Sequence, residues 1–239
     1  LIWEVVTKKG IDKKSFLMDI EKHIYQFPLS LQLSFKEIIN SEKQTVQTLK
    51  NIEMLEKIET IKINKNVKTS IKEGIPVRNA GIVLLNSYIV MLLERLHLLR
   101  DNEFTCTENQ IRAAQYLQYM VTGLTKTEEA YLPLNKVLCG LSMIHAIPDE
   151  IEISAEEKTL IQGLISAAIS YWTVIGDCSV DGFRGNWLVR DGILTESEDR
   201  WELTVDKKAY DILISKSPFA FSIIKYPWMD KPLHVNWPY

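Results

Sequence analysis

The sequence has few of the residues that build disulfides and metal sites. Its three cysteines are widely spaced and none belongs to a CxxC pair. This arrangement predicts reduced structural thiols of a cytosolic protein rather than a disulfide framework. The four histidines show none of the HxxxH or ExxH spacings that place metal ligands on one helix face. We therefore expect no metal site among Cys106, Cys139, Cys178, His23, His97, His145 and His234.

Sequence motifs of common enzymes are also absent. The chain contains no GxxxxGK[ST], GxGxxG or GxSxG, so neither a phosphate cradle nor a nucleophile elbow is indicated. Cys139 and His145 are a conceivable nucleophile and base, but the apolar neighbours of Cys139 favour a packed, inert thiol. We expect no enzyme and no cofactor. The alternative is a site assembled from distant residues around His97 or His145.

Neither the charge nor the hydrophobic runs indicate a nucleic acid or a membrane as partner. Lys and Arg number 28 against 31 Asp and Glu, a net charge of -3 that gives no broad attraction to phosphate. The longest apolar run, residues 80–93, would rise about 21 Å as a helix, against roughly 30 Å of hydrocarbon. No signal peptide is visible. The first residue, Leu1, is not Met, which predicts a piece of a longer polypeptide.

Residues 78–100 form the most hydrophobic stretch and predict a helix enclosed by its neighbours. Asn79 is its predicted N-cap. Large aliphatic side chains each contribute about 1.5–3 kcal/mol when buried, so this helix would supply much of the stability of one core.

The region before it predicts a separate N-terminal part, residues 1–77. Residues 13–27 place Phe16, Ile20, Ile24 and Phe27 on one helix face, and residues 29–39 fit a strand or a helix. Residues 41–59 predict a polar helix with one narrow apolar stripe: Val46, Leu49, Ile52, Leu55 or Glu56, and Ile58. Such a helix lies on a surface or pairs with one partner helix. Residues 61–76 predict a linker or ragged strand.

Residues 78–239 predict one compact domain with several further helices. A capping box at Thr107 and Gln110 begins a helix that ends at Gly123. A short helix spans residues 132–141, and a second capping box at Ser154 begins a helix to Gly176. Residues 180–190 predict a last short helix.

The C-terminal part adds a hairpin and an extended tail. Residues 192–195 and 201–205 predict two strands around a polar turn, and the following segment is rich in Pro and Trp. The predicted fold is therefore mainly α, a compact helical domain with a small C-terminal β-hairpin and an extended tail. A helix followed by a hairpin also resembles a winged-helix module, but acidic residues at the hairpin tip argue against DNA binding.

From residue 78 onward the chain resembles the tape measure family of contractile injection systems, which are phage-tail-like particles. Residues 114–123, AQYLQYMVTG, are similar to the family's LLQYLATG, and residues 134–141, LNKVLCGL, to its LNKLLCGL. Three further patches follow the family's order: 79–86, 172–194, and 227–229 with Val235 and Trp237. The resemblance indicates structural roles for Asn79, Gly81, Asn86, Gly123, Asn135, Lys136, Cys139, Gly140, Trp172 and Gly182.

The resemblance implies a structural component that anchors at a tube end, at the cap or baseplate, and contributes to tube-length control. Its expected partners are inner-tube, cap or baseplate proteins and further copies in a ring, as a trimer or hexamer. It would assemble in the cytoplasm and then belong to the particle, either attached to a membrane or released. The candidate interface residues are Arg184, Trp187, Trp201, Trp228, Met229 and Trp237, although a core position is an alternative for each Trp.

Overall fold

The computed structural model describes Lys22, in the first of two units of the chain, Leu1–Ile63, and residues 74–239, in the second, Asn64–Tyr239. Apart from Lys22, the predictions for residues 13–27, 29–39, 41–59 and 61–73 lie outside the described residues. The main helices are α4 (Asn86–Arg95), α5 (Thr107–Thr122), α6 (Pro133–Leu138), α7 (Ala155–Tyr171) and α8 (Val180–Phe183). The strands are β1 (Ile75–Val77), β2 (Leu99–Arg100), β3 (Glu103–Phe104), β4 (Gly192–Glu196), β5 (Trp201–Val205), β6 (Ile223–Ile224) and β7 (Leu233–Asn236).

The fold is mixed α and β rather than mainly helical, with 47% helix and 15% strand in the described region. The predicted hairpin, β4 and β5, is confirmed, but it forms the centre of a five-stranded sheet in the order β1-β4-β5-β7-β6. β1 pairs antiparallel with β4, and β7 runs parallel to β5. Both flanking strands come from segments far from the hairpin in sequence.

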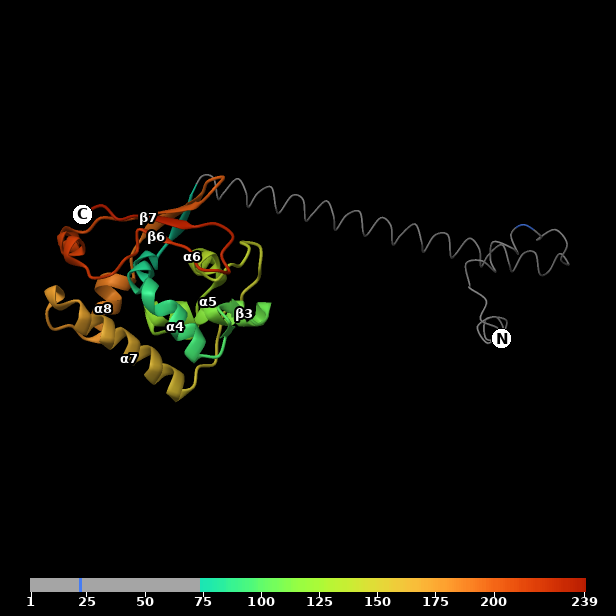
Figure 1. Ribbon diagram of the computed structural model, residues 1–239, viewed down its shortest axis with the longest axis horizontal. Coiled ribbons are helices and arrows are strands. Elements are labelled where there is room, and N and C mark those ends of the chain that lie inside the picture. The colour runs from blue at the N-terminus through green and yellow to red at the C-terminus, as the bar shows by residue number, and fades with distance from the viewer. Residues whose placement is uncertain (1–21, 23–73) are drawn as a thin grey trace. The chain divides into compact units, whose positions relative to one another are not determined.

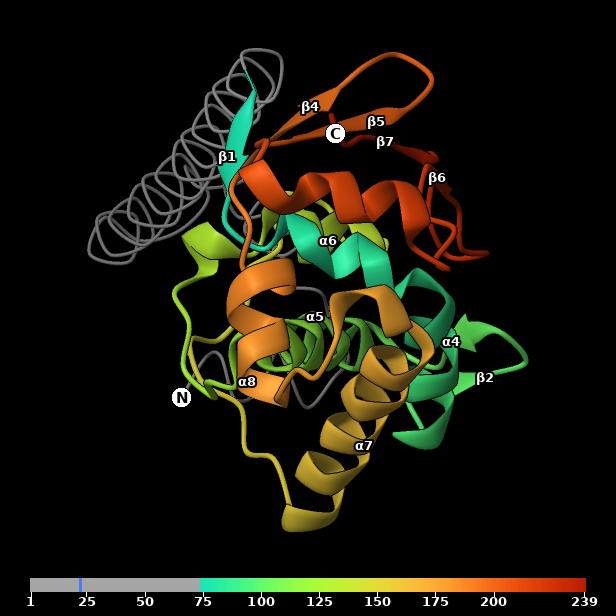
Figure 2. The same cartoon turned by 90° about the vertical axis from the view of Figure 1, so that its left-hand side faces the viewer.

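The sheet covers one side of a helical layer, as Figures 1 and 2 show. Its inward side chains include Leu194, Leu203 and Leu233, each fully buried. The hairpin therefore has a strand on both edges and a buried face, which is unlike the projecting wing of a DNA-binding module. The preceding helix α8 has only 4 residues and continues into one π-helical turn, Arg184–Leu188.

The hydrophobic stretch 78–100 is buried as predicted, but it is not a single helix. A 3-10 helix, Ala80–Leu85, comes first, and all its residues are buried. It passes into α4, which ends at Arg95, and Leu99 already belongs to a strand. Asn79 makes no side-chain cap hydrogen bond. Asn79 therefore occupies the N-cap position of the 3-10 helix, as predicted, but its side chain enters the core and does not cap the helix.

Of the other helix signals, two were confirmed and two were not. The capping box of Ser154 and Glu157 is present at the start of α7, and Gly123 ends α5 in the left-handed conformation with φ 73°. The predicted Thr107 capping box is absent, because Cys106 occupies the N-cap and Gln110 donates its side-chain hydrogen bond to the Cys139 carbonyl. α7 ends at Tyr171, earlier than predicted, and a 3-10 turn, Thr173–Ile175, follows.

Candidate functional site

Three buried amide side chains join the start of the domain to its helices. Asn79 Nδ2 donates to Gln118 Oε1 on α5 at 2.9 Å and to Asn135 Oδ1 on α6. Asn135 Nδ2 donates to the Ala114 carbonyl at 2.8 Å. Asn79, Gln118 and Asn135 are 1%, 6% and 0% exposed. This amide triad fixes the point where the chain leaves β1 and enters the core.

The next residues pack backbone against backbone. The Ala80 amide donates to the Arg190 carbonyl at 2.9 Å. A Cβ added to Gly81 would lie 1.7 Å from the Trp187 carbonyl oxygen, so no other residue fits here without movement of the backbone. Together with β1 and the amide triad, these contacts form what we call the N-terminal junction. It ties the segment arriving from residue 74 to the middle of the domain.

A fully buried ion pair lies directly behind this junction. Arg190 Nη1 and Nη2 donate to the two carboxylate oxygens of Asp211 at 3.0 and 2.6 Å, and both side chains are 0% exposed. Trp237 Nε1 and the Lys208 amide donate to Asp211 Oδ2 at 3.2 and 2.8 Å. The Arg190 guanidinium also lies 5.1 Å from the Trp237 ring centre. We call Arg190, Asp211 and Trp237 the tail lock.

The tail lock holds Asp211 as a carboxylate. Burial alone would raise the pKa of Asp211, but the hydrogen bonds from Arg190, the Lys208 amide and Trp237 bring the pKa below its usual value. Its charge therefore helps to keep the C-terminal tail against the domain near neutral pH.

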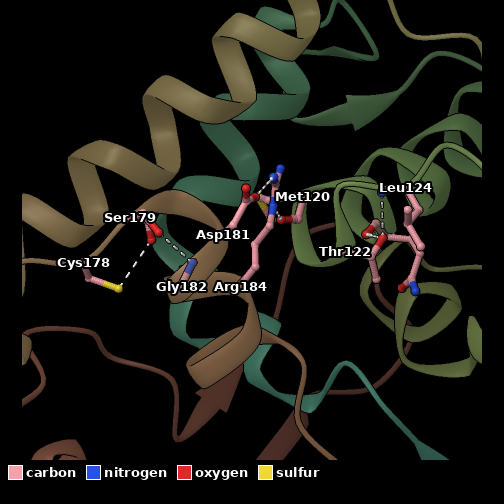
Figure 3. Close-up of polar contacts among 9 residues, drawn as sticks. Met120, Thr122, Leu124, Cys178, Ser179, Asp181, Gly182 and Arg184 are labelled. Carbon is pink, nitrogen blue, oxygen red and sulfur yellow. Dashed lines mark hydrogen bonds and ion pairs between the residues drawn. The ribbon is translucent and has the colours of Figure 1, made fainter.

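A second buried arginine closes the far end of α5, as Figure 3 shows. Arg184 Nε donates to the Met120 carbonyl at 3.1 Å, and Nη1 donates to Asp181 Oδ1 at 3.1 Å. A Cβ on Gly123 would lie 3.0 Å from Nη1. Arg184 therefore satisfies a carbonyl in the last turn of α5, where a positive charge also suits the helix dipole. In the same view the Gly182 amide donates to Ser179 Oγ at 3.0 Å, which caps α8.

The predicted interface residues lie mostly inside the domain. Arg184, Trp187, Met229 and Trp237 are 4–6% exposed, so they cannot meet a partner unless the domain opens. Trp201 and Trp228 are partly exposed. Trp228 is nevertheless anchored within the chain, because its Nε1 donates to the Leu138 carbonyl at 2.8 Å. As a surface for partners, the predicted set is reduced to the exposed parts of Trp201 and Trp228.

The other motif residues occupy structural positions too. Lys136 is buried and pairs with Glu129, and Asn86 Oδ1 accepts from the Tyr226 hydroxyl at 2.7 Å. Gly140 has φ 68° and packs against the Trp228 backbone, while Trp172 lies 4.5 Å from the Trp187 ring. The sequence reasoning missed Gln118, Arg190 and Asp211. For Gln118 and Asp211 the available signal was a polar or charged residue between apolar neighbours, whereas Arg190 is followed by Asp191 and gave no such signal.

The conceivable nucleophile and base, Cys139 and His145, lie in different environments. Cys139 is buried, and burial raises the pKa of its thiol, whereas His145 is exposed. No cluster of three or more His, Cys, Asp or Glu residues suited to a metal ion occurs among the described residues. In the same part of the chain, no helix has the length and hydrophobicity needed to cross a membrane.

Comparison with protein families gives a match over almost the whole chain. A family model described as "Contractile injection system tape measure protein" matches residues 3–237, almost the whole chain. Comparisons with curated proteins and with solved structures gave no match.

Proposed function

The chain belongs to the contractile injection system tape measure protein family, and on this premise we propose that its domain anchors the protein at a tube end. As a member of this family it is a structural part of a contractile injection particle and interacts with other components of that system. The proposed site of action is the cap or the baseplate, and the proposed effect is a contribution to tube-length control.

The size of the domain supports an anchor rather than a ruler. A compact domain of the 166 residues 74–239 has a radius of gyration of about 15 Å. A helix gains only ~1.5 Å in length per residue. A protein that measures the length of a tube must therefore be a long, extended chain and not a compact domain. The described domain is suited to holding one end of such a chain.

The N-terminal junction supports the same role. A load arriving through residue 74 would first meet the pairing of β1 with β4 and then the amide triad and Gly81. These contacts connect the incoming segment to α5, α6 and the tail lock. An anchor needs such a connection, because force on the chain must reach the whole domain and not a single strand.

The proposed role is non-enzymatic and involves protein partners alone. We propose that inner-tube, cap or baseplate proteins contact the domain and that several copies form a ring, as a trimer or hexamer. Assembly would take place in the cytoplasm before the protein becomes part of the particle. Neither a cofactor nor nucleic acid is required.

Imaging of particles tests this proposal. Cells lacking the chain would be compared with cells complemented by the full chain or by a variant with Asn135→Ala. Asn186→Ala is a matched control, because the Asn186 side chain is exposed. Electron microscopy would score tube length and end structure, and immunoblotting would confirm that each chain is present.

We expect missing particles, scattered tube lengths or open ends without the chain, milder defects with Asn135→Ala, and normal particles with Asn186→Ala. Normal tubes with normal ends in cells lacking the chain would overturn the proposal.

A further inference from the structure

A cleft of about 460 Å³ runs between α4 and α7. Leu92 and Leu164 form its buried floor, and Tyr88, Met91 and Leu160 line its walls with partly exposed side chains. No part of the N-terminal junction or the tail lock contributes to it. The cleft is thus a separate surface feature, made mainly of apolar side chains.

The two helices run antiparallel along the cleft. Tyr88, near the start of α4, and Tyr171, at the end of α7, both contact the Phe219 ring, with centroid distances of 6.1 and 6.3 Å. The opposite end of the cleft therefore brings Arg95, the last residue of α4, near Glu156 in the first turn of α7. Neither charge forms an ion pair within the described part of the chain.

The wall formed by α7 is open enough for a close helix approach. A Cβ added to Gly163 would meet nothing within 4 Å, and the next residue along this wall is the small, exposed Ala167. Small residues allow the backbone of a second helix to come near. A helix that binds in an apolar groove of this kind contacts it through its own apolar residues, which are spaced three or four apart in sequence. The chemistry therefore fits an amphipathic helix with one narrow apolar stripe.

We propose that this α4–α7 cleft binds residues 41–59 of a second copy of the chain as an amphipathic helix. The stripe of that segment extends from Val46 to Ile58, about 18 Å in helical form, and the cleft wall from Glu156 to Ala167 measures about 17 Å. The segment also carries Lys and Glu side chains beside its stripe. They complement Glu156 and Arg95 at one end of the cleft, two charges that form no ion pair with any described residue.

The position of β1 favours a second copy over the same chain. In both ribbon views β1 lies on the sheet side of the domain and α7 on the opposite side (Figures 1 and 2). The 14 residues 60–73 span at most ~48 Å when fully extended. A path over half the perimeter of this domain is about 60 Å. A head-to-tail contact between copies avoids that path and closes into a ring if the rotation allows.

This contact depends only on the chain itself and goes beyond the proposed role at the tube end, so either proposal can fail alone. The test uses two full-length chains with tags of different size, both carrying Cys106→Ser and Cys178→Ser. One chain adds Gly163→Cys in the cleft and the other Ile52→Cys in the stripe. A control pair replaces the cleft cysteine with Glu198→Cys in the exposed hairpin turn. The chains are mixed, oxidised and separated without reductant.

We expect a disulfide-linked product of both tags with Gly163→Cys and little with Glu198→Cys. Equal linking at both positions, or none at either, would overturn the proposal. A third chain carries both Gly163→Cys and Ile52→Cys. If a disulfide forms within this chain while the mixed pair gives no linked product, the proposal is overturned and the same chain is the occupant.

A second measurement removes the dependence on cysteine chemistry. Light scattering would give the molar mass of the full chain and of the variants Ala167→Arg and Ser166→Arg. Both positions are exposed on α7, but only Ala167 lines the cleft. Self-association should weaken at least tenfold with Ala167→Arg and remain unchanged with Ser166→Arg. A monomeric parent chain, or equal effects of the two variants, would contradict the proposal.

Discussion

The tail lock and the α4–α7 cleft treat charged side chains in opposite ways. In the tail lock, Arg190 and Asp211 are fully buried and paired with each other, with Trp237 Nε1 completing the carboxylate's partners. In the cleft, Arg95 and Glu156 lie beside apolar walls and remain unpaired within the described residues. Buried charges need partners in the same chain, whereas exposed charges are hydrated and can pair with another molecule. The comparison separates a region that completes the fold from one that is suited to assembly.

The largest expected effect comes from breaking the tail lock. Asp211→Asn leaves the buried Arg190 charge without its counter-ion and should lower the free energy of unfolding by about 3–5 kcal/mol. Urea unfolding of the full chain near neutral pH measures this change. Asp181→Asn is the matched control, since Asp181 pairs with Arg184 but its side chain is 92% exposed. A loss of stability in the control equal to that of Asp211→Asn would contradict the distinction between the two buried arginines.

The same pair predicts a pH dependence. Because the pKa of Asp211 is below its usual value in the folded chain, the stabilisation is complete above the pKa of the unfolded chain. It is lost as the pH falls through the lower, folded value. Unfolding measurements over acid pH should show a smaller decline for Asp211→Asn than for the parent chain. Parallel declines would assign the acid sensitivity to other groups.

Glycine substitutions compare the packed junction with the open cleft. Gly81→Ala forces a Cβ against the Trp187 carbonyl and should cost about 3 kcal/mol, at the upper end of overpacking effects. Gly163→Ala should stabilise the chain by about 0.5–1 kcal/mol, because it adds helix propensity where space is free. Thermal unfolding of both variants checks the opposite signs. Destabilisation of the same size by both variants would contradict the comparison between the junction and the cleft.

Local signals in the sequence predicted the ends of several helices but not the contacts that assemble the domain. Ser154 and Glu157 lie three residues apart, and Gly123 ends a helix by its own conformational freedom, so both could be found by inspection. The same rules placed Asn79 at an N-cap, where it lies, but its side chain makes no cap hydrogen bond. Its partner Asn135 lies 56 residues away, and no local pattern indicates such a hydrogen bond.

The sheet and the candidate site also depend on contacts between distant segments, which sequence patterns did not predict. The hairpin was predictable because its strands are adjacent and five residues long, whereas β1, β6 and β7 are short and pair with distant segments. Large aromatic residues such as Trp237 suggested an interface, yet the fold uses this ring to cover Arg190. Motif resemblance identified Asn79, Gly81 and Asn135, but their common role emerged only when their positions in space were known.

The amide triad should have a smaller effect than the tail lock, because it contains no formal charge. Asn79→Ala leaves Asn135 Oδ1 without its donor and Gln118 Oε1 with only the longer hydrogen bond from Asn135 Nδ2, at 3.4 Å. The change should cost about 1–3 kcal/mol. Chemical unfolding provides the measurement, with Asn186→Ala as the control for loss of an exposed amide. Equal stability of Asn79→Ala and the parent chain would show that the amide triad does not stabilise the N-terminal junction.

The smallest effect at neutral pH is expected at Tyr116, which joins α5 to the start of α7. Burial, followed by its hydrogen bond to Glu157, raises the pKa of Tyr116 to about 12. This stabilisation is complete below the tyrosine pKa of the unfolded chain, about 10, and is lost as the pH rises towards 12. Alkaline unfolding of Tyr116→Phe should therefore be less pH-dependent than that of the parent chain. Tyr239→Phe, at an exposed position, is the control.

The position of the domain in the particle tests the central claim most directly. A small epitope tag after Tyr239, which is 65% exposed, would be located on isolated particles by immunogold electron microscopy. The account predicts label at one end of each tube, with particles of normal length. Label distributed along the tube, or particles without label although the tagged chain is present in the cells, would contradict the role of the domain as a tube-end anchor.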